Sequence, residues 1–188
     1  MARLDPNRSF IPVRIAVLTV SDTRSFAHDK SGETLAARIR DAGHILAERR
    51  IVTDDVEAIR AAVRGFIRDP EVDVVITTGG TGFTGRDVTP EALEPLFEKR
   101  MDGFSDVFHR ISYDKIGTST IQSRATAGVA GATFIFALPG SPGACKDAWD
   151  GILRQQLDYR HMPCNFVEIM PRLDEHLRRG GGGKGHAG

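Results

Sequence analysis

Three short apolar runs constrain the fold of this chain more than any other feature. They are VRIAVLTV (13–20), VDVVITT (72–78) and ATFIFALP (132–139). A strand that is apolar along nearly its whole length must be buried on both faces, and such strands alternate with helices in parallel sheets. We therefore predict an α/β fold: a single-domain three-layer sandwich with a mostly parallel central sheet covered by helices on both faces.

The segments between these runs show the periodicities of further elements. Residues 31–43 and 54–69 have apolar side chains at helical spacing, and 44–52 is predicted as another strand. Residues 104–114 are predicted as a helix, whereas 118–131 could be a helix or a loop. Two hydroxyl–proline pairs have the pattern of an N-cap followed by proline at the first helical position. These pairs are Thr89-Pro90 and Ser141-Pro142.

The composition excludes several classes of protein. Lys+Arg and Asp+Glu balance at 25 each, so no net charge favours nucleic acid or an anionic membrane as a partner. Cys145 and Cys164 are too few for a disulfide framework, and no apolar stretch has the length of a membrane span. We expect one cytoplasmic protein. Its predicted parts are an N-terminal arm (1–10), an α/β domain (11–172) and a flexible glycine-rich tail (173–188).

Polar loops follow three of the predicted strands. Their sequences are SDTRS (21–25), GGTGFTGRD (79–87) and GSPG (140–143). In open α/β sheets, ligands bind beyond the carboxyl ends of the strands, at the point where the strand order reverses. The three loops therefore predict a binding site at one edge of the sheet.

The glycine loop, residues 79–87, matches neither common nucleotide-binding motif fully. Its G-x-G-x-x-G pattern does not open a helix directly, as a dinucleotide site requires. Its P-loop frame carries Arg86-Asp87 where Lys and Ser or Thr are needed. An aspartate there would repel phosphate unless a cation lay between them. Either Asp87 holds Mg²⁺ against a phosphate cradled by the loop N–H groups, or it only caps the local turn. The pattern leaves both interpretations open.

Other polar residues near the strand ends have similar alternatives. Asp22, Asp54 and Asp55 could each serve as ordinary turn or capping residues. Ser141 occupies the position of a hydrolase nucleophile, but Pro142 has no N–H to donate to an oxyanion. We expect Ser141 to cap a helix or to contact a substrate.

Several segments together resemble the MogA/MoaB family of molybdenum cofactor biosynthesis, whose domain also occurs in gephyrin. They are LTVSDTR, IVTDD, TTGGTGFTGRDVTPEA, IQSRATAGV and LPGSPGA. The similarity extends from about residue 14 to residue 171. IGTSTIQSRA and the closing PCNFVEIMPRL are most similar to the branch called molybdenum cofactor biosynthesis protein B.

The resemblance implies a function and a set of site residues. Active family members are molybdopterin adenylyltransferases, which use Mg²⁺ and ATP to place AMP on the terminal phosphate of molybdopterin. The family's acidic residues fall on Asp87 and Asp54, as metal ligands and catalytic residues, with Asp22 assisting. Thr53 stands where the family often has proline, so Asp55 remains an alternative to Asp54. The implied substrate-binding residues are Ser21, Gly79, Gly80, Thr81, Gly82, Pro139, Gly140 and Ser141.

The resemblance also implies partners. The family assembles as homotrimers, and trimers pair into hexamers in this branch; other cofactor-biosynthesis proteins are possible partners. A second hypothesis is a non-catalytic protein that binds or carries molybdopterin in the same pathway.

Overall fold

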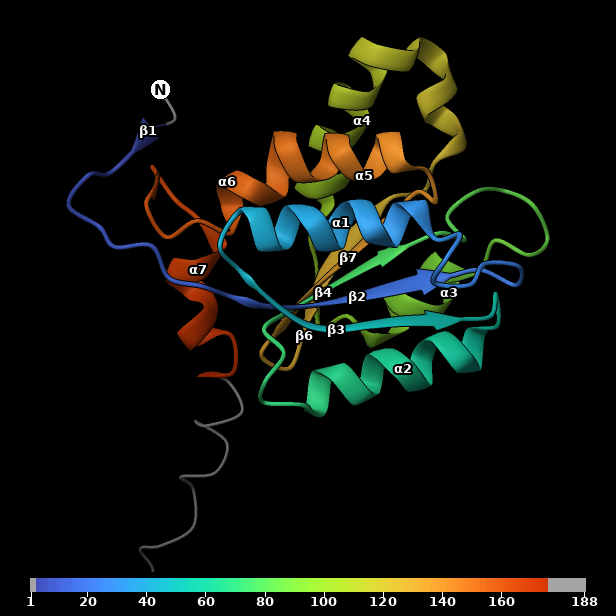
Figure 1. The fold of residues 1–188 in the computed structure, drawn as a ribbon, viewed down its shortest axis with the longest axis horizontal. Helices are drawn as coiled ribbons and strands as arrows, with labels where there is room; N and C mark the ends of the chain where they lie inside the picture. Colours follow the sequence, from blue (N-terminus) through green and yellow to red (C-terminus); the bar gives the residue numbers. More distant parts are fainter. Residues whose placement is uncertain (1–2, 176–188) are drawn as a thin grey trace, which may run out of the picture.

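A computed structural model describes residues 3–175 and contains one large mixed sheet (Figure 1). The strand order is β3-β2-β4-β7-β6-β5. Parallel pairings join β3, β2, β4 and β7, whereas β6 and β5 are added in antiparallel orientation. The strands are β2 (Arg14–Val20), β3 (Ile45–Val52), β4 (Val74–Thr78), β5 (Lys99–Arg100), β6 (Thr126–Ala130) and β7 (Thr133–Leu138).

Helices cover both faces of this sheet, which confirms the predicted three-layer arrangement (Figure 1). One face carries α1 (Lys30–Asp41), α4 (Asp102–Ile116) and α5 (Pro142–Ala148). The other carries α2 (Val56–Arg68) and α3 (Thr89–Leu93). After α5 the chain continues through a π-helical turn, Trp149–Leu153, into α6 (Arg154–Gln156). A short α7 (Phe166–Ile169) follows near the end of the described chain.

The alternation of side chains along each strand creates two hydrophobic cores. Val17, Ile76 and Phe136 face α1, α4 and α5, where they pack with Trp149. Their strand neighbours, including Leu18, face α2 and α3. The central strands are therefore buried on both faces, and this is the physical reason for their nearly continuous apolar sequences.

Residues 118–131 are neither one helix nor one loop. They contain the end of a 3-10 helix, Gly117–Gln122, and strand β6, which forms a hairpin with β7. Three of the five residues of β6, TAGVA, are alanine or glycine, which are depleted in strands, and the strand signal was therefore weak. Gly128 is required by packing, because a Cβ there would lie 2.4 Å from Cγ of Phe97.

The predicted N-terminal arm contains a short strand, β1 (Arg3–Leu4), which pairs antiparallel with β8 (His161–Met162). This small second sheet was not predicted. Residues 176–188 of the predicted tail lie outside the described part of the chain. Between residues 3 and 175, no helix is both long and apolar enough to cross a membrane.

Candidate functional site

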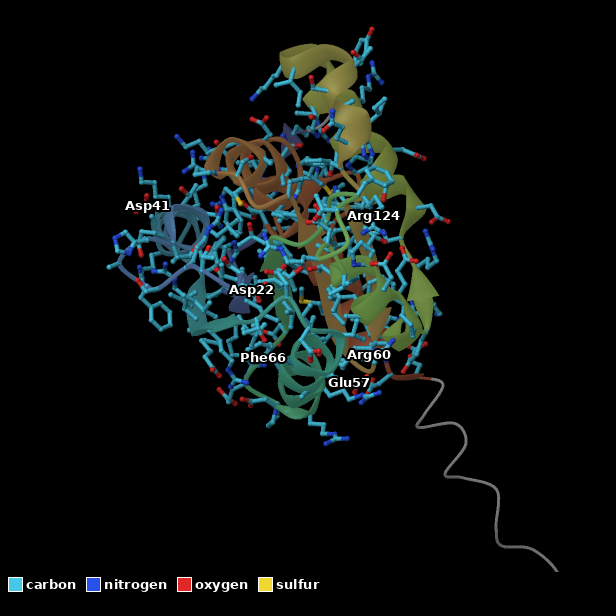
Figure 2. All side chains as sticks on the ribbon, turned by 90° about the vertical axis from the view of Figure 1, so that its right-hand side faces the viewer. Asp22, Asp41, Glu57, Arg60, Phe66 and Arg124 are labelled. Carbon is cyan, nitrogen blue, oxygen red and sulfur yellow. The ribbon has the colours of Figure 1, made fainter. Side chains whose placement is uncertain are left out.

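A cavity of about 390 Å³ lies at the carboxyl ends of β2, β4 and β7. Strand β3 lies beside β2 on one side, whereas the next strand along the chain, β4, lies on the other side of β2, so the strand order reverses here. Figure 2 looks onto this end of the sheet, with Asp22 near its centre. The cavity is lined by Val20, Ser21, Arg24, Asp54, Gly79, Gly80, Thr81, Gly82, Asp87, Gln122, Ser123, Pro139, Gly140 and Ser141.

The three polar loops predicted from the sequence thus meet at one cavity. All the predicted site residues line it except Asp22, which lies beside it. Asp22 and Asp54 are joined by reciprocal hydrogen bonds: each backbone N–H donates to the other's carboxylate at 3.0 Å. A guanidinium nitrogen of Arg86 is 3.7 Å from Asp22 Oδ2. The loop after β2 is therefore linked at the cavity rim to the chain after β3 and to the glycine loop.

Gly79 and Gly80 let the chain turn sharply out of β4. Their φ angles are +109° and +64°, in the left-handed region that glycine adopts without strain. A Cβ on Gly79 would lie 2.2 Å from the carbonyl oxygen of Val20. The two glycines therefore allow the loop to lie directly against the end of β2.

Thr89 has a different role from the one predicted. It begins α3, but its hydroxyl makes no helix-capping bond. Instead, it donates to the carbonyl oxygen of Gly79 at 2.8 Å. The prediction of an N-cap was wrong because the nearby loop offers a buried acceptor that the local sequence does not reveal. This bond connects the segment just after the glycine loop to Gly79, the first residue of the loop.

Asp54 and Asp55, which sequence alone could not separate, have distinct environments. Asp55 is the N-cap of α2 and accepts a hydrogen bond from the N–H of Ala58 at 2.8 Å. Asp54 faces the cavity. Burial raises the pKa of Asp54, and the negative charges of Asp22 and Asp87 reinforce this rise. A cation in the cavity would relieve the repulsion among these carboxylates.

Asp87 is bound within its own loop and also lines the cavity. Its Oδ2 accepts from the N–H of Thr84 at 2.8 Å and from the Thr84 hydroxyl at 2.6 Å. Burial alone would raise the pKa of Asp87, but these bonds and one from Gly82 outweigh it and lower the pKa. The local hydrogen bonding proposed in the simpler interpretation is present, and it favours the charged carboxylate.

The acidic residues do not form a complete metal cage. Within residues 3–175, no group of three or more His, Cys, Asp or Glu side chains is placed to hold a metal ion. Mg²⁺, however, is commonly held by one or two carboxylates, with water and substrate phosphates as the other ligands. Asp54 and Asp87, with their mutual repulsion, fit that smaller donor set.

Arg124 supports the glycine loop and was not identified from the sequence. Its backbone N–H donates to Thr81 O at 2.9 Å, and its guanidinium donates to Gly82 O and Asp87 O, each at 2.8 Å. It also pairs with the carboxylate of Glu91. Figure 2 shows Arg124 on the same face as Asp22. Its segment was predicted only as helix or loop, which gave no indication of where the side chain would lie.

Ser141 is a helix cap, as expected. Its hydroxyl oxygen accepts from the N–H of Ala144 at 3.1 Å, at the start of α5. The nearby thiol of Cys145 is buried, and burial raises its pKa to about 11. Neither side chain is therefore arranged as an activated nucleophile.

Comparisons with known proteins agree with this geometry. Residues 16–159 match the family described as a probable molybdopterin binding domain. Molybdenum cofactor biosynthesis protein B of Escherichia coli (strain K12) is 52% identical over 157 residues, covering 84% of this chain and 92% of that protein. The protein of the same name from Bacillus subtilis (strain 168) is 44% identical over 146 residues, covering 77% and 86%.

Solved structures show the same fold. A crystal structure of molybdenum cofactor biosynthesis protein B has a TM-score of 0.77 and 37% identity, covering 92% of this chain and 99% of that one. The tungsten cofactor synthesizing protein MoaB from Pyrococcus furiosus has a TM-score of 0.67 and 32% identity, covering 87% and 98%. This chain therefore belongs to the molybdenum cofactor biosynthesis family that carries the probable molybdopterin binding domain, and its role is in the biosynthesis of that cofactor.

Proposed function

We propose that the protein binds molybdopterin and transfers AMP from ATP to the terminal phosphate of the pterin. The observation that carries this proposal is the position of Asp54 and Asp87, which face a cavity bordered by the glycines of residues 79–82. Nucleotidyl transfer needs the reacting phosphates to be held in line and their charge to be neutralised. Loop N–H groups and carboxylates that bind a cation are suited to these two tasks.

The reaction requires no nucleophile from the protein. A terminal phosphate oxygen of the pterin attacks the α-phosphorus of ATP, the bond from that phosphorus to the bridging oxygen breaks, and pyrophosphate leaves. The glycine loop binds and orients the phosphates, and Arg124 keeps the loop in place. A magnesium ion held by Asp54 and Asp87 would supply neutralisation of the phosphate charge.

A non-catalytic molybdopterin carrier is the second candidate, and one observation favours it. Two hydrogen bonds from Thr84 already occupy Oδ2 of Asp87, so this carboxylate also has a purely structural use. A protein could keep the loop for that reason and bind pterin without turnover. The two candidates differ in whether ATP is consumed.

The experiment that tests the proposal incubates the purified full chain with molybdopterin, Mg²⁺ and ATP, and follows adenylylated pterin and pyrophosphate. Asp87→Asn is assayed beside the matched control Asp55→Asn. Asp55 caps α2 outside the cavity, and asparagine is an equally good cap. Wild type and Asp55→Asn should both form product. Pterin binding without product in either protein would contradict adenylyl transfer and support the carrier.

Assembly into a homotrimer or hexamer is a separate part of the proposal. Large apolar side chains are exposed on α4 and the 3-10 helix that follows it: Val107, Tyr113, Ile116 and Ile121. These elements project above the α1–α5 layer (Figure 1), where a second copy could cover them. Sedimentation of a monomer at micromolar concentration would contradict self-association. Cytoplasmic location and contacts with other proteins of the pathway remain predictions.

A further inference from the structure

Charged side chains of both signs line the cavity, and they contact different loops. Asp54 and Asp87 lie against the glycine loop: a Cβ on Gly80 would be 3.1 Å from Asp54 Oδ1, and one on Gly82 would be 2.8 Å from Asp87 Oδ2. Among the described lining residues, Arg24 carries the positive charge. It lies at the other loop, where its guanidinium donates to the carbonyl oxygen of Gly140 at 2.8 Å.

The charge of Arg24 is not cancelled by a close carboxylate. Its two hydrogen-bond acceptors, Ser31 Oγ and Gly140 O, are neutral. The nearest acidic oxygen is Asp29 Oδ1 at 3.9 Å. Asp29 is fully buried and already pairs with Arg49 at 2.9 Å, besides accepting hydrogen bonds from Thr19 and Gly32. The compensating charge for Asp29 therefore comes mainly from Arg49.

The guanidinium of Arg24 also retains donors that can reach a ligand. The two bonds use two of its five N–H groups, and no described residue provides an acceptor for the other three. The side chain is 31% exposed, so it is held by its neighbours but open to the cavity. An arginine fixed in this way is suited to a phosphate, whose oxygens can accept two parallel hydrogen bonds.

We propose that Arg24 forms a second, metal-independent phosphate subsite, which binds a phosphoryl group of the ATP substrate beside Gly140. Assignment of this anion to the substrate rests on the proposed function. Arg24 would anchor one phosphoryl group directly, whereas a phosphoryl group beside Asp54 and Asp87 requires a cation between carboxylate and phosphate. The different contacts of Arg24 and of the two carboxylates would thereby fix the direction in which a polyphosphate lies.

Pyrophosphate in the presence of EDTA is the probe that isolates this subsite. Isothermal titration of the full chain compares wild type, Arg24→Gln, Arg24→Lys and Asp87→Asn. Arg86→Gln is the matched control: Arg86 is also near the carboxylates, but its side chain is 79% exposed. Near-ultraviolet circular dichroism and urea unfolding establish that each variant is folded.

Wild type should bind pyrophosphate saturably without metal. Arg24→Gln should weaken binding about tenfold or more, since a charge-assisted hydrogen bond contributes about 1.5–3 kcal/mol. Arg24→Lys should weaken it less, because lysine keeps the charge but not the paired donors. Arg86→Gln should change it less than about threefold, and Asp87→Asn should leave it equal or tighter.

Equal affinity in wild type and Arg24→Gln, or no binding by wild type, would overturn the subsite. If Arg24→Gln does not fold, unchanged affinity in Arg24→Lys overturns it and a several-fold loss supports it. The adenylylation assay separates this result from the proposed function. Arg24-dependent pyrophosphate binding without turnover retains the subsite and rejects the enzyme. Turnover with an ATP KM unaffected by Arg24→Gln retains the enzyme and rejects the subsite.

Discussion

The two ends of the central sheet each carry a polar cavity, and the comparison separates structural from functional charge. The cavity at the amino end is the larger, about 460 Å³ against about 390 Å³. Two of its carboxylates are paired: Asp158 accepts from two guanidinium nitrogens of Arg160 at 2.9 and 2.8 Å, and Asp150 pairs with Arg38. At the carboxyl end, the negative charges of Asp22 and Asp87 disfavour the charged form of Asp54. Repulsion between neighbouring carboxylates, and not volume, distinguishes the candidate site.

The amino-end cavity is also bordered by packed rings. His44 is buried, its ring lies 5.0 Å from that of Phe10 and 6.1 Å from that of Trp149, and its Nδ1 accepts from the N–H of Val13. Arg160 lies over the Phe10 ring at 5.2 Å. These contacts join the N-terminal segment to the end of α1 and the chain after α6. We interpret this region as structural support, with its polar groups used inside the fold.

Asp87→Asn should have the largest effect on function. Asparagine can still accept the hydrogen bonds from Thr84 through its amide oxygen, so the loop is retained while the charge is lost. Adenylylation should fall about 100-fold or more, while pterin affinity changes less than about threefold. Single-turnover kinetics and direct pterin titration measure the two quantities. Equal losses of both would show that Asp87 shapes the loop and does not act on phosphate charge.

Gly79→Ala should give the largest loss of stability among changes at the carboxyl end of the sheet. Alanine would be strained at φ +109°, and its Cβ would meet the Val20 carbonyl oxygen at 2.2 Å. We expect the free energy of unfolding to fall by roughly 1–3 kcal/mol or more, measured by urea denaturation. Gly85→Ala is the matched control, because nothing lies within 4 Å of a Cβ there. Similar losses in both variants would contradict the close approach of the loop to β2.

Much of this arrangement could be predicted from local sequence, and the rest depends on contacts between distant segments. Periodicity identified β2, β3, β4, β7 and the main helices because each has its own apolar pattern. Strand β6 consists mostly of small residues and is stabilised by β7 and Phe97, while β1 requires β8, so neither could be read locally.

The same limit applies to the site. The glycine loop and Asp54 were found by their motifs, but the separation of Asp54 from Asp55 needed the orientation of α2. Arg24 and Arg124 were missed because a lone arginine in a loop has no periodic pattern. Their roles arise from carbonyl oxygens on segments far away in the sequence.

The adjacent residues Asp54 and Asp55 allow a reciprocal test, because the carboxylate of Asp54 faces the cavity whereas that of Asp55 caps a helix. Asp55→Ala removes a helix cap and should lower the free energy of unfolding by about 1 kcal/mol, with turnover unchanged. Asp54→Asn should reduce turnover without loss of stability, because the raised pKa of Asp54 means that its charged form disfavours folding. Urea unfolding and the adenylylation assay are run on both variants. The reverse assignment of effects would make Asp55 the family aspartate.

The smallest expected effect on turnover concerns His44 at the amino end. Burial lowers the pKa of His44 from 6.5 to about 4, although the negative charge of Asp158 opposes the shift. The unfolded state therefore binds a proton at a higher pH than the folded state, and stability falls as the pH drops from about 6.5 to about 4. His44→Gln should flatten the dependence of unfolding free energy on pH in that window. An unchanged slope in His44→Gln would show that His44 is not held neutral, and the amino-end cavity would then contain a titrating charge of its own.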